Sequence, residues 1–272
     1  MQSSQTEIRE DRDFVTSLAR GLEVIRSFNA ENPEMTLSEI AANTDLSAAT
    51  VRRSLITLEK LGYVQRRQKR FLLTAKVLTL GASYLDSMNI KEIAQSYLLE
   101  LVEASSAAAS LTVLDGLEVV YIAHIPSKQR IRHGRSVGSR LPAYATSTGL
   151  VLLTYASERK REELYEAMPL RPYTSRTPVE IKELQERFKY IEQHGYTVAC
   201  DTIEYGAIAL AVPIKDIKGN VIAAINYATT TTIFSEEQIV EQHLLSVQEC
   251  ANKIGAMLGR YPALVHSVAI DL

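Results

Sequence analysis

The sequence predicts an α+β protein in two parts, a winged helix-turn-helix over the first quarter and an antiparallel sheet covered by helices over the rest. Three observations carry this prediction. Apolar residues recur at helical spacing as far as Leu61, a strongly basic segment spans residues 47–70, and two hairpin signals appear beyond Ala107. With 272 residues, 46% of them hydrophobic, the chain has enough material for two cores.

Three helices are predicted before Gly62. The first ends at Asn32-Pro33, and its apolar face consists of Leu18, Leu22, Ile25 and Phe28, with Val24 beside it. Thr36 and Glu39 have the spacing of a capping box, which predicts a short second helix that ends near Thr44. Ser47 is a suitable N-cap for the third helix, whose inner face is formed by Val51, Leu55, Leu58 and Leu61.

The basic segment points to DNA. Residues 47–70 hold seven Lys or Arg against one acid, whereas the whole chain has a net charge of −2. In a helix-turn-helix the start of the second helix meets base edges and flanking cations meet phosphate. The candidate DNA-binding residues are Arg20, Thr36, Ser47, Ala48, Thr50, Arg52, Arg53, Arg66, Arg67, Lys69 and Arg70. The alternative is a solvated basic face on an ordinary helical hairpin.

Residues 63–73 predict a wing, with β-rich runs at Tyr63-Val64 and at Phe71-Leu72-Leu73. The stretch between them, Gln65 to Arg70, lacks the Asp-Gly or Asn-Gly pair that a tight primed turn prefers. We therefore expect a longer and looser wing whose cations position the protein on phosphate.

The second part alternates between strand and helix signals. Helical patterns cover 75–87 and 90–104, and the first of these is expected to connect the two parts. Asp115-Gly116 and Lys218-Gly219-Asn220 each lie between two apolar runs, which predicts two β-hairpins. The further helices are predicted near 147–156, 158–167, 178–194 and 235–258.

A polar loop, residues 137–149, leads into an apolar helix. Backbone N–H groups at Ser147 to Gly149 would lie at its N-terminus, where unpaired donors and the helix dipole suit a small carboxylate. Just upstream are the basic residues Arg130, Arg132, His133 and Arg135, which favour an anionic ligand. The alternative is a plain N-cap in which Thr146 or Ser147 only satisfies the helix.

Other functional classes find little support. His194, Cys200 and Asp201 lie within one short segment, but nothing in the sequence supplies a base-paired thiolate and an oxyanion site, so we expect no enzyme activity. Cys200 and Cys250 are too few and too far apart for a zinc site, and we expect neither metal nor cofactor. No segment predicts a signal peptide or a membrane span, so we expect a soluble protein of the reduced cytoplasm.

From Ser17 to the last helix the chain resembles the IclR family of bacterial transcriptional regulators. The resemblance rests on the following stretches: residues 17–22, 37–41, 46–53, 58–64, 119–123, 137–149, 195–196 and 208–213. It implies a winged helix-turn-helix, a linker helix and a GAF-like effector domain assembled as a homodimer or dimer of dimers. The stretches 76–81 and 140–147 look like the branch that controls aromatic-acid catabolism, through protocatechuate and p-hydroxybenzoate regulators.

The resemblance also implies boundaries and a pocket. We expect an N-terminal arm over 1–15, the DNA-binding domain over 16–74, the linker helix over 75–89 and the effector domain over 90–272. The family's effector pocket maps onto Arg130, His133, Thr146, Ser147, Thr148, Ala199, Ala209, Asn226 and Ala228. Ala48 departs from the family, since many relatives carry Arg there.

Together these points predict a ligand-responsive regulator of a catabolic operon, with a small aromatic carboxylate as effector. Its partners would be a double-stranded operator, a second copy of the chain and RNA polymerase, and no membrane. The effector's carboxylate would meet the Ser147 and Thr148 amides, Asn226 or Arg130, and His133 would meet the ring hydroxyl. A same-family sensor of an aliphatic acid remains open, as does a metabolite-binding or hydrolytic α+β domain whose helical N-terminus binds proteins.

Overall fold

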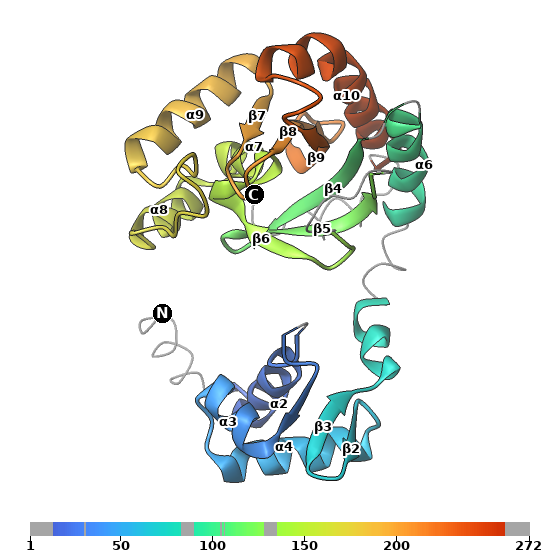
Figure 1. Ribbon diagram of the computed structural model, residues 1–272, viewed down its shortest axis with the longest axis vertical. Helices are drawn as coiled ribbons and strands as arrows, with labels where there is room; N and C mark the ends of the chain where they lie inside the picture. Colours follow the sequence, from blue (N-terminus) through green and yellow to red (C-terminus); the bar gives the residue numbers. More distant parts are fainter. Residues whose placement is uncertain are drawn as a thin grey trace. The chain divides into compact units, whose positions relative to one another are not determined.

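The chain divides into two compact units, Met1–Tyr84 and Leu85–Leu272, and the division falls within the predicted linker helix. The computed structural model describes residues 13–29, 31–82, 90–103, 105, 107–127 and 135–258. The predicted fold class is confirmed, since a helical unit with a small sheet precedes a larger sheet covered by helices (Figure 1). Among the described helices none is long and apolar enough to cross a membrane.

The described part of the N-terminal unit contains α2 (Thr16–Arg26), α3 (Leu37–Thr44) and α4 (Ala48–Lys60). Their buried side chains form one core with residues of the small sheet: Val24, Phe28, Met35, Ile40, Val51, Leu55, Leu58, Val64 and Phe71. The first helix is confirmed, but only part of its predicted face is buried, since Ile25 and Phe28 pack in the core and Leu18 and Leu22 do not. Leu18 and Leu22 are 62% and 48% exposed, whereas Val24 is fully buried.

Local hydrogen bonds fix where the helices of the helix-turn-helix begin. Thr36 caps α3 by accepting the Glu39 N–H, and the Glu39 carboxylate accepts the Thr36 N–H at 2.7 Å, so the predicted capping box is confirmed. Asp45 ends the helix in the left-handed region with a φ of 51°. Ser47 then caps α4 by accepting the Thr50 N–H at 3.3 Å. The helix, turn and helix are therefore in the predicted places.

The wing differs from the prediction in two ways. Strands β2 (Val64–Arg67) and β3 (Arg70–Leu73) pair up to Arg67 opposite Arg70, which leaves a tight two-residue turn rather than a long loop. Gln68 adopts a positive φ of 55° in that turn without Asn, Asp or Gly. A third strand, β1 (Glu34–Thr36), pairs with β3 and was not predicted, because three residues are too few to show alternation.

The start of the connecting segment is anchored on the N-terminal unit. A 3₁₀ turn, η1 (Ala75–Val77), follows β3 and continues into helix over residues 78–82. The Thr74 hydroxyl donates to the Gly62 carbonyl at 2.5 Å, and Lys76 Nζ donates to the Leu61 carbonyl at 2.9 Å. The rest of the predicted linker helix, 83–89, lies outside the described residues.

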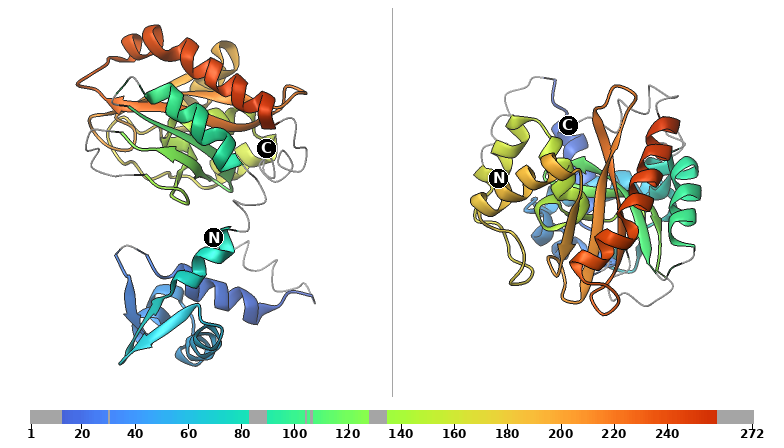
Figure 2. Two further views of the ribbon diagram at one scale, coloured as in Figure 1. Left: turned by 90° about the vertical axis from the view of Figure 1, so that its right-hand side faces the viewer. Right: turned by 90° about the horizontal axis from the view of Figure 1, so that it is seen from above.

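In the C-terminal unit the described residues form a six-stranded antiparallel sheet in the order β6-β5-β4-β9-β8-β7 (Figure 1). The strands are β4 (Ala108–Asp115), β5 (Glu118–Ile125), β6 (Arg140–Pro142), β7 (Thr197–Cys200), β8 (Ala207–Lys215) and β9 (Val221–Thr230). The helices are α6 (Ile90–Val102), α7 (Ser147–Tyr155), α8 (Glu158–Glu166), α9 (Ile181–His194) and α10 (Glu236–Leu258), with a 3₁₀ turn η2 (Ala143–Ala145) before α7. Helices α6 and α10 lie side by side in Figure 2.

Both predicted hairpins are present. Asp115 pairs with Glu118, so Gly116 and Leu117 form a two-residue turn in which Gly116 has a φ of 61°. The β8–β9 turn is held by Asp216, whose carboxylate accepts the Lys218 and Asn220 N–H groups at 2.8 Å each. The two hairpins place β4 and β9 next to each other at the centre of the sheet.

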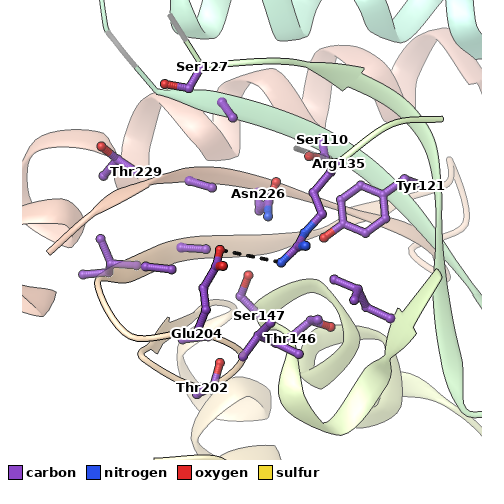
Figure 3. Close-up of a pocket in the computed structure, with 18 of the residues that line it drawn as sticks. Ser110, Tyr121, Ser127, Arg135, Thr146, Ser147, Thr202, Glu204, Asn226 and Thr229 are labelled. Carbon is purple, nitrogen blue, oxygen red and sulfur yellow. Dashed lines mark ion pairs between the residues drawn. The ribbon is translucent and has the colours of Figure 1, made fainter. Parts of the chain in front are cut away.

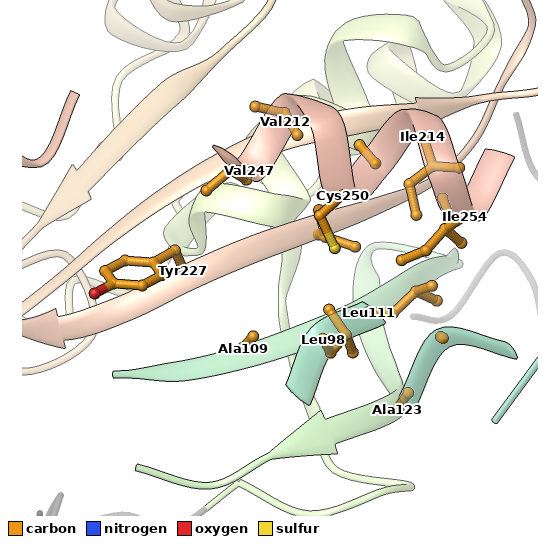
Figure 4. Close-up of a cluster of buried hydrophobic side chains, with 14 of the residues drawn as sticks. Leu98, Ala109, Leu111, Ala123, Val212, Ile214, Tyr227, Val247, Cys250 and Ile254 are labelled. Atoms are coloured by element: carbon orange, nitrogen blue, oxygen red, sulfur yellow. The ribbon is translucent and has the colours of Figure 1, made fainter. Parts of the chain in front are cut away.

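Alternation along the central strands gives the sheet two unlike faces. On one face small and polar residues such as Ala108, Ser110 and Asn226 surround a cavity (Figure 3). On the other face their neighbours Ala109, Leu111 and Tyr227 pack against α6 and α10 (Figure 4). The second face is closed by large apolar side chains, including Leu98, Val247, Cys250 and Ile254. Helix α7 and its neighbours cover only part of the first face, which leaves room for a site.

Candidate functional site

The N-terminal unit presents α4 as a recognition helix. Val51, Leu55 and Leu58 are buried, so helical spacing turns Arg52 and Arg53 to the exposed side. Ser47 and Ala48 are exposed at the helix start, and the Ser47 and Thr50 hydroxyls hydrogen-bond at 2.9 Å. Ala48 adds only a methyl group at the first helical position, so at this end the exposed polar side chain is that of Ser47.

The wing residues Arg66, Arg67 and Lys69 are exposed, as a phosphate-binding role requires. Arg66 is held by its own turn, because Nε donates to the Gln68 carbonyl at 2.7 Å and the guanidinium lies 5.8 Å from the Phe71 ring centroid. Arg70 differs from the other three. Its Nη1 donates to the Glu34 carbonyl at 3.0 Å and lies 3.5 Å from Glu39 Oε2, so its charge is partly balanced inside the unit.

A groove of about 780 Å³ lies between α2, the end of α4 and the start of the connecting segment. Its lining includes the exposed Leu22, Leu61 and Leu80. Arg20 and Arg53 also border it. The predicted DNA-binding residue Arg20 is therefore half-buried at an apolar groove, whereas Arg53 both lines the groove and is exposed.

The C-terminal unit holds a cavity of about 370 Å³. It is bounded by the small-residue face of the sheet, the segment before α7, the start of α7 and the β7–β8 loop (Figure 3). The lining residues are Ala108, Ser110, Tyr121, His124, Pro126, Ser127, Arg135, Leu141, Ala145, Thr146, Ser147, Ala199, Thr202, Ile203, Glu204, Ala207, Ile208, Ala209, Asn226, Ala228 and Thr229. This volume and mixed lining are typical of small-molecule sites.

Arg135 and Glu204 supply the charge of the described lining. Arg135 Nη2 and Glu204 Oε1 are 3.9 Å apart, and the two side chains are only 23% and 22% exposed. The Tyr121 hydroxyl lies beside Arg135 (Figure 3), and burial raises the pKa of that tyrosine. His124 accepts from or donates to Ser110 at 3.1 Å, and burial, followed by the nearby Arg135 charge, lowers its pKa. Tyr121 and His124 are therefore neutral at pH 7.

Asn226 is the polar centre of the cavity wall. Asn226 is only 7% exposed, and its Oδ1 has no hydrogen-bond partner. A buried acceptor without a donor costs stability, which a ligand with an N–H or O–H group could recover. The neighbouring Ser110, on β4, pairs with Asn226 in the strand register.

The start of α7 lies at the opposite wall. Thr146 is its N-cap and accepts the Gly149 N–H at 3.1 Å, so this hydroxyl serves the helix. Ser147 lines the cavity, whereas the fully buried Thr148 is not among the lining residues. A side chain at Gly149 would lie 2.2 Å from the Ala143 carbonyl oxygen, which shows how closely the chain turns back on itself here.

Most of the predicted pocket positions gather at this cavity. Thr146, Ser147, Ala199, Ala209, Asn226 and Ala228 all line it. Arg130 and His133 lie outside the described residues. Sequence reasoning did not select Ser110, Tyr121, His124 or Glu204. A polar residue inside an apolar strand would have identified Ser110, but nothing local distinguishes Glu204 from other acids.

The structure offers no support for the catalytic reading. His194 stacks on Tyr190 with ring centroids 4.0 Å apart, and its Nδ1 contacts the Tyr190 carbonyl at 2.9 Å. Burial raises the pKa of Cys200, whose Sγ accepts from Arg176 at 3.4 Å, so the thiol form is favoured. Within the described ranges no group of His, Cys, Asp and Glu could hold a metal ion.

Family models match both units. Residues 17–68 match the IclR helix-turn-helix domain, and residues 82–256 match the bacterial transcriptional regulator IclR C-terminal domain. The Pca regulon regulatory protein of Pseudomonas putida is 36% identical over 244 residues, which cover 89% of this chain and 84% of that protein. The p-hydroxybenzoate hydroxylase transcriptional activator of Acinetobacter baylyi is 33% identical over 256 residues, 92% of this chain and 94% of that protein.

A solved structure resembles the C-terminal unit. It is the inducer-binding domain of the PobR transcription factor from Acinetobacter, a double mutant in complex with 3-hydroxybenzoic acid. It superposes with a TM-score of 0.57 at 32% sequence identity and covers 61% of this chain and 98% of that chain.

Proposed function

This chain belongs to the IclR family of bacterial transcriptional regulators, and we propose that it controls an aromatic-acid catabolic operon in response to a hydroxylated aromatic carboxylate. The class of the protein, a DNA-binding and ligand-responsive regulator rather than an enzyme, follows from the family and from the two regulators described above. The observation that carries the effector proposal is the cavity, whose described lining includes one guanidinium, that of Arg135, and a buried amide oxygen without a hydrogen-bond partner, that of Asn226.

The chemistry of the walls favours this ligand class. Arg135 offers a guanidinium for a carboxylate, and the first N–H groups of α7, at Ser147, add donors and the positive end of the helix dipole. Asn226 Oδ1 requires a donor, which a ring hydroxyl provides. An aromatic acid with a hydroxyl group meets both needs, and the bound 3-hydroxybenzoic acid of the related inducer-binding domain is of that class.

Calorimetry on the full chain tests the ligand class. We expect 3-hydroxybenzoate, 4-hydroxybenzoate or protocatechuate to bind, and succinate and adipate not to bind. Arg135→Gln should weaken that binding at least about tenfold, since a charge-assisted pair is lost. The matched control is Arg159→Gln on α8, whose side chain is 88% exposed, and it should leave binding unchanged. If only aliphatic diacids bind, the aromatic assignment is wrong.

On DNA, two recognition helices would meet major-groove faces about 34 Å apart or a multiple of that spacing. Such an arrangement needs two copies of the chain. The exposed leucines at the groove of the N-terminal unit, among them Leu18, Leu22 and Leu80, are suited to a homodimer contact. Sedimentation of the full protein and of Leu22→Glu tests this, because a variant as oligomeric as the wild type would exclude the groove.

The proposal includes the domain boundaries 1–15, 16–74, 75–89 and 90–272. A regulator of this kind acts in the bacterial cytoplasm, where its operator and RNA polymerase are. The effector changes operator occupancy only if it binds one arrangement of the dimer better, and about 1.4 kcal/mol of differential affinity gives a tenfold change.

A further inference from the structure

We propose that residues 202–205 form a flap through which the effector enters and leaves the cavity, and that Thr177 is a positioning residue that holds this flap closed. The inference rests on the proposed function, namely that the cavity binds the effector. Thr202, Ile203 and Glu204 line the cavity, and Figure 3 shows two of them at its border. The next residue, Tyr205, is 69% exposed. The cavity wall is therefore a single layer of chain at this place.

Other walls of the cavity have protein behind them. One wall is the sheet, whose opposite face packs against α6 and α10 (Figure 4). Another is the start of α7 with the segment before it, where Ala145 and Thr148 are fully buried. Among these described walls the flap is the one that meets solvent on its outer side. Moving the flap therefore opens the cavity with less loss of packing than moving the sheet or the helix.

A closed neck separates the flap from the two strands that it connects. Strands β7 and β8 pair as far as Cys200 opposite Ile208. The Asp201 N–H then donates to the Ala207 carbonyl at 2.8 Å, and Asp201 Oδ1 accepts the Gly206 N–H at 2.6 Å. Asp201 and Gly206 both lie in the left-handed region, with φ of 58° and 88°. The four residues between them can therefore move while the strand pairing and the neck stay intact.

The Thr177 hydroxyl ties the flap to the segment between α8 and α9. Thr177 is buried, and its Oγ1 donates to the Thr202 carbonyl at 2.6 Å. The same oxygen accepts the Tyr173 and Thr174 N–H groups at 2.9 Å each, which fixes its position. The Thr174 hydroxyl also donates to the carbonyl of Asp201, at the neck. The segment is thus anchored on the rigid neck, and from there Thr177 holds the start of the flap.

A second tie joins the other end of the flap to the same segment. The Tyr205 hydroxyl accepts the Ser175 N–H at 3.1 Å and donates to the Ser175 hydroxyl at 3.2 Å. Water competes for these hydrogen bonds because both residues are exposed, so they contribute less than the buried one. We therefore expect Thr177 to have the larger influence on the flap.

The hydrogen bond from Thr177 to Thr202 should affect rates rather than affinity. It is made in the closed flap whether the cavity is empty or filled, so its loss should leave the dissociation constant Kd unchanged. It is broken in the open state through which the ligand passes, and such opening steps limit association and release. Losing the bond should therefore raise the rate constants kon and koff by the same factor. The net contribution of a typical hydrogen bond corresponds to about fivefold.

Thr177→Val and Tyr205→Phe in the full-length protein test the inference. The ligand is 3-hydroxybenzoate, 4-hydroxybenzoate or protocatechuate, whichever binds most tightly. Exchange spectroscopy of the ligand's NMR signals gives koff, calorimetry gives Kd, and the ratio of the two gives kon. We expect Thr177→Val to raise both rate constants about fivefold and to change Kd less than about twofold. Tyr205→Phe should raise both rate constants about twofold.

Two controls separate the hydrogen bond from general loosening. Thr177→Ser keeps the hydroxyl and should keep the wild-type rate constants. Thr154→Val removes another buried hydroxyl, which donates to the Leu150 carbonyl within α7 at 2.7 Å, and it should leave both rate constants unchanged. Thermal unfolding of each variant shows whether it is folded. If Thr177→Val does not fold, Tyr205→Phe decides the question, because its side chain is exposed.

The outcomes separate the two proposals. A higher koff with an unchanged kon overturns the flap, because it indicates a damaged cavity wall rather than an entrance. Unchanged rate constants in the folded variants also overturn it, because the ligand then enters elsewhere. Either result leaves the proposed function standing. A wild type that binds none of the three aromatic acids removes the proposed effector class, and the inference with it.

Discussion

The two units use arginine in opposite ways. In the N-terminal unit Arg52, Arg53 and Arg67 are exposed on a helix and a wing, where salt screens them and DNA phosphates can reach them. In the C-terminal unit Arg135 is 77% buried and has Tyr121 and Glu204 beside it. Exposed charge gives long-range attraction with little selectivity, whereas a buried charge with fixed neighbours selects one ligand chemistry.

The two sites also differ in how the chain builds them. The DNA-binding candidates lie mainly between residues 36 and 70 and are oriented by helix caps within that segment. The cavity takes residues from Ala108 to Thr229, on six strands, a helix start and the segments that follow β5 and β7. Small changes of packing should therefore damage the cavity much more than the recognition helix.

The largest effect should come from a methyl group at the start of α7. Gly149→Ala places its Cβ 2.2 Å from the Ala143 carbonyl oxygen, a backbone atom that cannot move alone. We expect the C-terminal unit to lose about 3 kcal/mol of unfolding free energy and effector binding to fail, since Ser147 shifts with the helix. Denaturant unfolding and calorimetry measure the two effects.

The same substitution in the N-terminal unit is the matched control. Gly21 lies in α2, and its added Cβ would meet no atom within 4 Å. Gly21→Ala should stabilise that unit by roughly 0.5 to 1 kcal/mol through helix propensity. Equal effects at the two glycines would mean that the cavity wall tolerates repacking as well as the exposed helix does.

Next in size is the loss of a base contact. Arg53→Ala should weaken binding to the specific operator by about 1 to 3 kcal/mol if the side chain reaches a base edge. Arg67→Ala in the wing should weaken specific and nonspecific DNA alike and reduce the salt slope by about 0.9. An unchanged gel-shift midpoint for Arg53→Ala would remove that role and leave α4 with phosphate contacts only.

A substitution of Asn226 should have a smaller effect. It shows whether ligand binding, rather than folding, depends on this side chain. Asn226→Ala removes a buried acceptor that has no partner, so the unfolding free energy should change little while 4-hydroxybenzoate binding weakens about tenfold. Thr112 is the control, because its buried hydroxyl is also unpartnered but does not line the cavity. Thr112→Val should leave affinity unchanged, and a loss of affinity there would implicate general packing.

The smallest effect is a difference in acid sensitivity. Burial lowers the pKa of His124 and of His243, so the folded C-terminal unit holds them neutral, and its stability falls as pH drops below the unfolded value of about 6.5. The segment 1–84 contains no histidine. There the Thr36 N–H lowers the pKa of Glu39, and the stabilisation is lost only as pH falls below about 4.5.

Scanning calorimetry between pH 7 and pH 5.5 compares how the stability of each unit depends on pH. The transition of the C-terminal unit should move to lower temperature, while that of the N-terminal unit stays in place. A double variant, His124→Gln with His243→Gln, should lose most of that shift. A shift retained by the double variant would assign the acid sensitivity to other groups.

Several elements could be predicted from the sequence because interactions between residues close together in the chain determine them. Thr36, Glu39 and Ser47 fix helix starts through hydrogen bonds three residues apart, and Gly116 fixes a hairpin through its positive φ. The wing shows the limit of this reasoning. Its turn is tight without a favourable residue pair, because pairing of β3 with both β2 and β1 holds Gln68 in the left-handed region.

The sequence by itself determined the order of elements, the helix-turn-helix with its basic surface and, through the resemblance of whole stretches, the family and some of the positions around the pocket. Only the tertiary structure brought Arg135, Tyr121 and Glu204 together and left Asn226 Oδ1 without a partner. The reason is physical. Caps and periodicity act within a few residues, whereas the neighbours of a cavity are set by loop anchoring between residues 57 apart and by strand register between residues more than 100 apart.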